Sequence, residues 1–172
     1  MQVAWLHSTV LRDWMMEAEM HYPLETGGVL IGYWANPATA VVTHAVGAGP
    51  RSVHRHDSYD HDHEWESSEI ALYYERSRGS ETYLGDWHTH PDARSGDLSA
   101  LDRRSLRRII ASPSARTSRP LMTVLFGDPH NWTSAIWLAE LKRFWLFDRL
   151  IVYPVTSRVF EDSTKYAASP EG

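Results

Sequence analysis

The histidines of His88-Thr89-His90-Pro91 have the spacing that most directly suggests chemistry. They end an apolar run with the character of a β-strand, in which residues i and i+2 project from the same face. Two imidazoles on one face can converge on one metal ion, and Pro91 keeps the pair at the end of the strand. The alternative is a pair of half-exposed strand histidines that bind nothing.

The context distinguishes this pair from others of the same spacing. The ten histidines of the chain include three such pairs, His54/His56, His61/His63 and His88/His90. Composition alone predicts about 0.6 pairs of this kind. Because the third pair ends an apolar strand, we favour it as the metal-ligating one.

A third ligand is expected downstream. A catalytic zinc ion typically takes three protein ligands and a water molecule, and in a chain without cysteine these are histidine and carboxylate side chains. Asp102 lies in the first turn of a predicted helix, and Ser99 lies one helical turn before it. Both residues are also compatible with helix capping alone, with the aspartate favoured by the helix dipole. Asp97 is the alternative third ligand.

Metal-assisted hydrolysis also needs a base that accepts a proton from water. Glu25 precedes an apolar strand in the sequence Glu25-Thr26-Gly27-Gly28, far from the histidines along the chain. On its own, without this context, an ordinary loop carboxylate is the favoured interpretation of Glu25.

Together these segments resemble a known motif. Glu25-Thr-Gly-Gly-Val-Leu-Ile-Gly, His88-Thr-His90-Pro91 and Ser99-x-x-Asp102 are similar, in order and in setting, to the JAMM motif of JAB/MPN metallopeptidases. The resemblance spans about residues 6–138, and Tyr83-Leu-Gly-Asp-Trp87 resembles the small prokaryotic JAB proteins. The sequence departs at one point, because seven residues separate Pro91 from Ser99 where the common form has six.

The resemblance implies roles for five residues. His88, His90 and Asp102 would hold one Zn²⁺ per chain, with water as the fourth ligand. Glu25 would be the general base, and Ser99 would donate a hydrogen bond to the tetrahedral oxyanion. The implied enzyme is a zinc isopeptidase that cleaves after the C-terminal Gly of a ubiquitin-like modifier or of a conjugated protein. Activating- and conjugating-enzyme homologues of anti-phage operons are the implied partners.

Two other functions fit the sequence less well. Many MPN domains are catalytically silent scaffolds, but those lack part of the zinc set that this chain retains. A metal-dependent nuclease would need oxygen-rich Mg²⁺ ligation and a basic channel, and neither is evident in the sequence.

The elements that must position these residues are predicted from hydrophobic periodicity, capping residues and Gly/Pro turns. Strands are predicted at 2–6, 27–34, 40–46, 81–90, 121–126 and 132–138 and in the apolar segment 143–155, and helices from an N-cap at Ser8 to about 20, at about 64–77, and from an N-cap at Ser99 to about 110. Such interleaving predicts a mixed α/β (α+β) fold with a central sheet. The resemblance implies a single MPN/JAB-like domain, with a mostly antiparallel curved sheet flanked by helices.

Length and charge limit the remaining choices. The 172 residues suggest one domain, which we place at 1–162, followed by a frayed tail at 163–172. The formal net charge of −5 argues against nucleic acid as a partner. No apolar run is long enough for a membrane span, and Arg12, Asp13 and Glu17 come too early for a signal peptide. A cytoplasmic protein is therefore expected.

Three further features are assigned less sharply. The first is an acidic, histidine-rich segment, formed by His54, His56, His61 and His63 with Asp57, Asp60, Asp62 and Glu64. It could be a second metal site, but a solvated loop beside the active cleft is favoured. The second is a row of arginines on the helix after Ser99, which indicates a solvated face or an acidic partner rather than a phosphate site: Arg103, Arg104, Arg107 and Arg108. The third is the pair Trp65 and Trp87, which could border a substrate groove.

Overall fold

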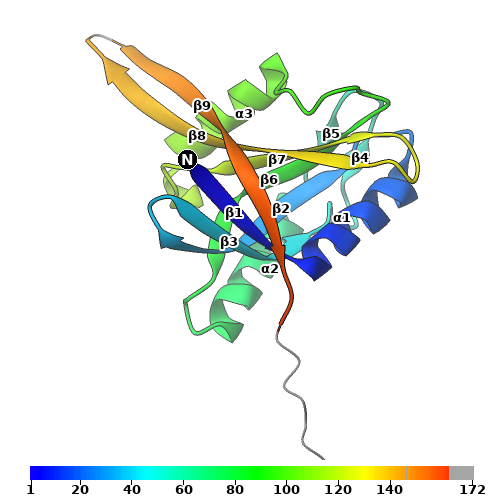
Figure 1. Cartoon of the computed structure of the whole chain (residues 1–172), viewed down its shortest axis with the longest axis horizontal. Helices are drawn as coiled ribbons and strands as arrows, with labels where there is room; N and C mark the ends of the chain where they lie inside the picture. Colours follow the sequence, from blue (N-terminus) through cyan, green and yellow to red (C-terminus); the bar gives the residue numbers. More distant parts are fainter. Residues whose placement is uncertain (146, 163–172) are drawn as a thin grey trace, which may run out of the picture.

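The computed structural model describes residues 1–145 and 147–162. In chain order the elements are β1 (Gln2–His7), α1 (Ser8–His21), β2 (Gly27–Asn36), β3 (Thr39–Val46), β4 (Val53–His54), β5 (Tyr59–Asp60), α2 (His63–Arg76), β6 (Thr82–Pro91), α3 (Ala100–Ala111), a 3-10 turn (Pro113–Ala115), β7 (Leu121–Gly127), β8 (Thr133–Phe144) and β9 (Phe147–Phe160). Figure 1 shows the long strands β8 and β9 extending beyond the rest of the fold as a hairpin.

Seven strands form one closed sheet in the order β1-β3-β2-β6-β7-β8-β9. Strand β1 pairs in parallel with both β3 and β9, and β6 pairs in parallel with β7, whereas the other neighbours are antiparallel. The predicted mixed fold, with a mostly antiparallel curved sheet and flanking helices, is confirmed. The curvature continues until the β1–β9 pairing closes the sheet, which leaves no open edge along these strands.

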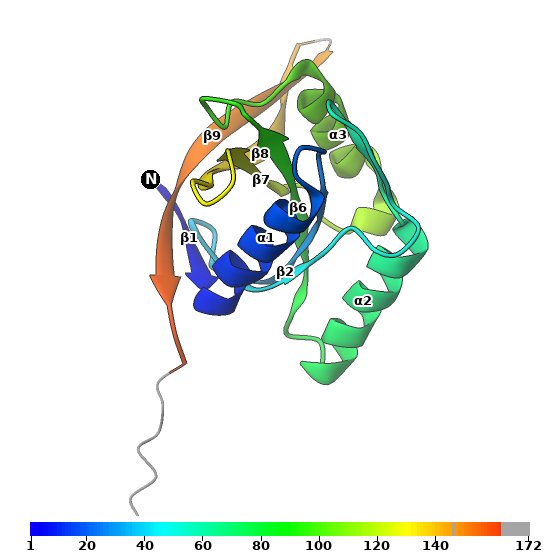
Figure 2. The ribbon, with the colours of Figure 1, turned by 90° about the vertical axis from the view of Figure 1, so that its right-hand side faces the viewer.

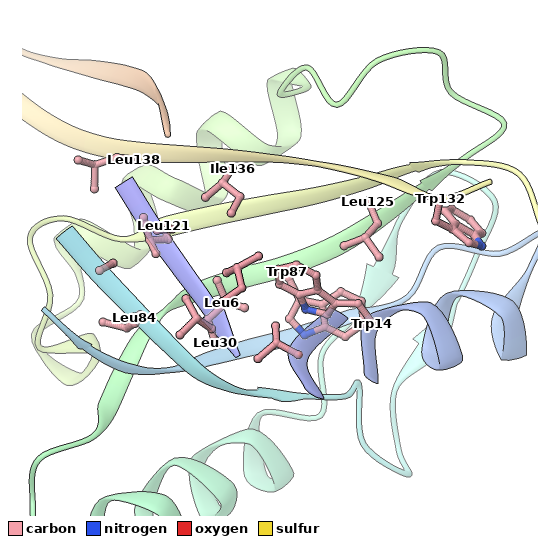
Figure 3. Close-up of a cluster of buried hydrophobic side chains, with 14 of the residues drawn as sticks. Leu6, Trp14, Leu30, Leu84, Trp87, Leu121, Leu125, Trp132, Ile136 and Leu138 are labelled. Carbon is pink, nitrogen blue, oxygen red and sulfur yellow. The ribbon is translucent and has the colours of Figure 1, made fainter. Parts of the chain in front are cut away.

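The inner face of the sheet is filled by one large apolar cluster (Figure 3), to which α1 contributes Val10, Trp14 and Ala18. The ring centroids of Trp14 and Trp87 lie 6.2 Å apart, and both side chains are only 1% exposed. Truncation of such a buried aromatic side chain typically costs roughly 3–5 kcal/mol. The core therefore fixes β6, the strand that carries the histidine pair, against α1.

Helices α2 and α3 cover the outer face of the same sheet (Figure 2). Ile70 and Tyr73 of α2 pack on residues of β2 and β3, and Leu106 of α3 packs on Met122 and Val124 of β7. Strand β6 is thus covered on both faces, which explains why most of its residues from Leu84 to Thr89 are buried.

The first helix begins differently from the prediction. His7, not Ser8, is the N-cap, and its Nδ1 accepts a hydrogen bond from the backbone N–H of Thr9. Strand β1 runs directly into the helix, so the residue with extended backbone at the junction is the histidine. Serine is a commoner capping residue than histidine, so the prediction placed the cap at Ser8, one residue too late.

Two predicted segments also differ in the structure. The polar stretch after Pro50 contains a small antiparallel hairpin, β4–β5, whose strands have two residues each and leave almost no sequence signal. The apolar segment 143–155 is not one strand, because Phe144 at the end of β8 pairs with Phe147 at the start of β9. Trp145 adopts a φ of 45° there, a conformation that usually calls for Gly or Asn, so no turn residue marked the reversal.

The predicted frayed tail, 163–172, lies outside the described residues. Within the described part of the chain, no helix has both the length and the apolar composition needed to cross a membrane.

Candidate metal centre

The histidine pair lies near the end of β6, on the face of the sheet that α3 covers. His88 pairs with Gly27 of β2 on one side and with Val124 of β7 on the other. Trp87 lies in the inner core, so alternation along the strand places His88 and His90 together on the outer face. Their Nε2 atoms are 3.0 Å apart, and His88 is only 6% exposed.

Asp102 reaches this pair from the first turn of α3. Its Oδ1 lies 3.2 Å from Nε2 of His88, and its Oδ2 lies 3.7 Å from Nε2 of His90. The backbone N–H of Ser99 donates to Asp102 Oδ2 at 2.7 Å, and the N–H of Asp102 donates to Ser99 Oγ at 3.2 Å. The capping box and the contact with the histidines therefore coexist, and the capping box orients the carboxylate toward the imidazoles.

The three side chains have the donor chemistry of a divalent metal site. Zinc bonds of about 2.0–2.2 Å in a tetrahedron place neighbouring ligand atoms roughly 3.3 Å apart. The contacts among His88, His90 and Asp102 run from 3.0 to 3.7 Å and bracket this value. Two histidines and a carboxylate, without sulfur, are also a usual ligand set for a catalytic zinc ion.

The surroundings favour the protonation states that a metal requires. Burial opposes ionisation of Asp102, but hydrogen bonds with His88 and with Ser99 hold the pKa of its carboxyl well below the ordinary value. Burial, together with the charge of His88, lowers the pKa of His90. A carboxylate and a neutral imidazole are the forms that bind a cation.

The loop between Pro91 and Ser99 is held to the strands β7 and β8 by two hydrogen bonds. The N–H of Asp92 donates to the carbonyl of Gly127 at 2.6 Å, and the indole N–H of Trp137 donates to the carbonyl of Gly96 at 2.8 Å. Leu98 is then buried against β7. Asp97, the alternative ligand, is exposed and accepts a hydrogen bond from Ser95 Oγ, outside the cluster of His88, His90 and Asp102.

Backbone pairing brings Glu25 to the same place. The N–H of Thr26 donates to the hydroxyl of Thr89 at 2.9 Å, and the N–H of Thr89 donates to the carbonyl of Thr26 at 2.8 Å. Thr89 lies between the two histidines on β6, and Glu25 immediately precedes Thr26, its partner. Glu25 is therefore held next to the histidine pair. Burial raises the pKa of the Glu25 carboxyl to about 7, with a lowering effect of His88 and a raising effect of Asp102.

Two glycines allow this close approach of strands. A Cβ on Gly27 would lie 2.4 Å from the carbonyl oxygen of Trp87, and one on Gly28 would lie 1.9 Å from that of Val46. Both positions are therefore closed to any side chain. Glycine here has a packing cause, because the backbones of β2, β3 and β6 approach one another closely beside the histidine pair.

The β4–β5 hairpin holds the backbone of Glu25, a role that the sequence did not suggest. The N–H of Glu25 donates to the carbonyl of Arg55 at 2.7 Å, and Nδ1 of His54 lies 2.9 Å from the carbonyl oxygen of Glu25. The His54 ring also stacks on His21, with centroids 3.8 Å apart. Both contacts depend on a hairpin with two-residue strands, so no periodicity could have indicated them.

The histidine-rich segment is only partly solvated. His56 and His63 are exposed, whereas His54 and His61 are partly buried and Asp62 is buried against Arg51. The four arginines of α3, at 103, 104, 107 and 108, are exposed.

The expectation that Trp87 borders a groove is wrong. Its indole is in the inner core and donates to the carbonyl of Val46 at 2.9 Å. Trp65 is exposed and packs over Gly49.

Comparison of the sequence with known proteins identifies one matching family and several similar proteins. Residues 7–143 match the family model described as prokaryotic homologs of the JAB domain. The chain is 42% identical over 150 residues to "Probable metalloprotease y4qB" of Sinorhizobium fredii, a match that covers 87% of this chain and 92% of the relative. It is 37% identical over 112 residues to the "CD-NTase/cGAS isopeptidase" of Vibrio cholerae, covering 65% of this chain and 67% of that relative.

The fold is shared more widely. The solution structure of a protein from Desulfitobacterium hafniense superimposes with a TM-score of 0.61 at 15% identity, covering 95% of this chain and 97% of that chain.

Proposed function

The chain belongs to the prokaryotic homologs of the JAB domain, a family of hydrolases, and from this premise we propose that it is a zinc-dependent isopeptidase. The proposed reaction is hydrolysis of the bond after the C-terminal Gly of a ubiquitin-like modifier or of a conjugated protein. The observation that carries the proposal is the convergence of His88, His90 and Asp102 at 3.0–3.7 Å, beside Glu25.

We propose separate roles for the ligands and for the base. His88, His90 and Asp102 would hold Zn²⁺, which would supply a water nucleophile active at about pH 7 and polarise the scissile carbonyl. Glu25 accepts a proton at its carboxylate and later gives it to the leaving amine. Its raised pKa, about 7, suits a group that must both take and release a proton near neutral pH.

Ser99 is proposed to stabilise the oxyanion. Its Oγ accepts a hydrogen bond from the N–H of Asp102, so the hydroxyl proton remains available for donation. The capping contact holds Oγ in place, so the donor is preorganised. Its hydrogen bond to the substrate oxygen strengthens as negative charge develops there.

The substrate class is inferred from two relatives. The proteins named CD-NTase/cGAS isopeptidase, from Vibrio cholerae and Enterobacter hormaechei, carry in that name an action on conjugated proteins. We propose by analogy a protein conjugate as substrate, activating- and conjugating-enzyme homologues as partners, an anti-phage or related modifier system, and a cytoplasmic location. We also propose residues 1–162 as the catalytic domain.

The proposal is tested with matched ubiquitin-like fusions that end in Gly-Gly, Ala-Gly or Leu-Leu before the scissile bond. Attack requires the substrate backbone to approach the reacting groups to about 3 Å, which favours small residues there. We expect preferential cleavage of the Gly-Gly fusion, abolished by a chelator and restored by Zn²⁺. Equal cleavage of all three fusions, or of unstructured peptides without a modifier domain, would instead indicate a general peptidase.

Replacement of Ser99 by alanine is expected to lower kcat by about 10²–10³-fold, the usual effect of removing an oxyanion donor. The same change removes the N-cap of α3 and is expected to cost about 1 kcal/mol of folding stability. Rates and unfolding curves measured together separate these effects. Ser99→Thr keeps a hydroxyl and a cap and should retain most activity, whereas an unchanged kcat in Ser99→Ala would remove Ser99 from the reaction.

The pH dependence should reflect Glu25. A base must be deprotonated to act, and burial moves the pKa of Glu25 from its ordinary value to about 7. Activity is therefore expected to rise with pH toward neutrality, with about a tenfold loss per pH unit below the midpoint. The positive charge of a bound metal moves that midpoint to lower pH. The profile of kcat/KM is measured with metal content checked at each pH, and an acidic limb that persists unchanged in Glu25→Gln would contradict the assignment.

A further inference from the structure

A second cluster of metal-ligating side chains lies at the start of α2, outside the site described above. His61 Nδ1 is 2.7 Å from Glu66 Oε1, and His63 Nδ1 is 3.4 Å from Glu66 Oε2. One ligating atom from each residue lies within 4.8 Å of the other two. The two imidazole rings are stacked, with centroids 5.3 Å apart and planes 8° apart. The donors are again two histidines at i and i+2 and one carboxylate.

Glu66 forms ion pairs with the two histidines, whereas the neighbouring acidic residues pair with Arg51. Arg51 pairs with Asp62, the N-cap of α2, and with Glu64 in its first turn. The ion pairs that the structure gives Glu66 are both with imidazoles, and the Glu66 side chain is only 7% exposed. At 2.7 Å the Nδ1–H of His61 donates a hydrogen bond to the Glu66 carboxylate, and a divalent cation that displaces this proton would bind Glu66 and both imidazoles.

We propose that His61, His63 and Glu66 form a second divalent-cation site that binds Zn²⁺ more weakly than the site at His88. The affinity is lower because the His63 side chain is 84% exposed and loses rotamer freedom on binding. In addition, the ion competes with the hydroxyl of Tyr59, which lies 3.2 Å from Nδ1 of His61.

The position of this site gives the ion a structural consequence. His61 follows β5 directly, whereas His63 and Glu66 belong to α2, so the ion joins the hairpin to the helix. Figure 2 shows the hairpin reaching from the start of α2 toward α3.

The same hairpin holds Glu25. Arg55 and His54 contact the backbone of Glu25, and the Tyr59 ring lies so close to Gly27 that a Cβ there would be 2.6 Å from it. Occupation of the second site therefore stiffens the support of Glu25, which makes His61, His63 and Glu66 positioning residues.

The test is isothermal titration calorimetry, in which Zn²⁺ alone is titrated into the chelator-stripped full chain. The wild type is expected to show one strong and one weak class of site. In His63→Ala the weak class should lose at least about 10–100-fold in affinity, since loss of an outer partner alone has that effect. The matched control is His56→Ala, which removes an exposed histidine of the same hairpin that is not in the cluster. It should bind as the wild type does.

Amide hydrogen exchange gives an independent readout. Exchange of residues 53–61 should slow when the second equivalent of Zn²⁺ binds to the wild type or to His56→Ala, but not when it is added to His63→Ala. A weak class that survives His63→Ala, or a wild type with the strong class alone, would overturn the inference. The inference is independent of the isopeptidase proposal, because Asp102→Asn should abolish the strong class and leave the weak one.

Discussion

Glu25→Gln is expected to lose about 10²–10⁴-fold in kcat while keeping its fold and its metal, because it removes only the general base. Glutamine has nearly the shape of glutamate, and the contacts that fix this residue are made by its backbone, to Arg55 and His54. Glu25 also lies outside the set of His88, His90 and Asp102, so no ligand is lost. Steady-state kinetics and elemental analysis of the same preparation measure both quantities.

Stability provides the control for this variant. Because burial raises the pKa of Glu25 from 4.5 to about 7, the free energy of unfolding of the metal-free protein falls as the pH rises through that range. Above pH 7 Glu25 is charged in the folded protein, and the cost of burying that charge is present in full. The metal-free Glu25→Gln variant should consequently unfold at no lower temperature than the wild type at pH values above about 7. A variant that cleaves at the wild-type rate would place the base elsewhere, and the acidic, histidine-rich segment would be the next candidate.

The strand that carries the histidines was predictable from local sequence. An apolar run that ends in His88-Thr89-His90-Pro91 specifies a strand with two side chains on one face, and the structure has β6 at Thr82–Pro91. The helix that carries Asp102 was equally accessible, because Ser99 and Asp102 form a capping box whose signature is local. In both cases the information lies within a few residues of the chain.

The position of Glu25 was not a local property. It depends on the pairing of Thr26 with Thr89, residues that are 63 positions apart. Only the resemblance to a known motif indicated this proximity from the sequence. The supporting contacts of Arg55 and His54 were missed altogether, since a hairpin with two-residue strands has no measurable periodicity.

Two aromatic residues were misassigned for different physical reasons. Trp87 alternates with the histidines along β6, so the face that brings His88 and His90 to the site necessarily turns Trp87 into the core. Sequence proximity to the site was therefore a misleading guide for Trp87. At Trp145 a large aromatic residue adopts a positive φ, and the hairpin of β8 and β9 reverses without the Gly or Asn that would have revealed it.

Asp102→Asn is expected to have the largest effect on metal binding, which should weaken by at least about 100-fold, with activity lost in proportion. The amide oxygen of asparagine can still accept the hydrogen bond from the N–H of Ser99, so the capping box and the start of α3 are preserved. What disappears is the negative charge, and the two imidazoles alone form a poor site for a divalent cation. A loss of metal in this variant therefore reports ligation rather than misfolding.

Asp97→Asn is the matched control for Asp102→Asn, since Asp97 is the alternative ligand, lies in the loop just before α3 and is exposed. Its metal content and rate should equal those of the wild type. If Asp97→Asn lost the metal and Asp102→Asn retained it, the loop would have to rearrange around the ion and Asp102 would serve as a helix cap alone. The 3.2 Å contact of Asp102 with His88 predicts the opposite result, because it places the carboxylate beside the two imidazoles, where a third ligand is needed.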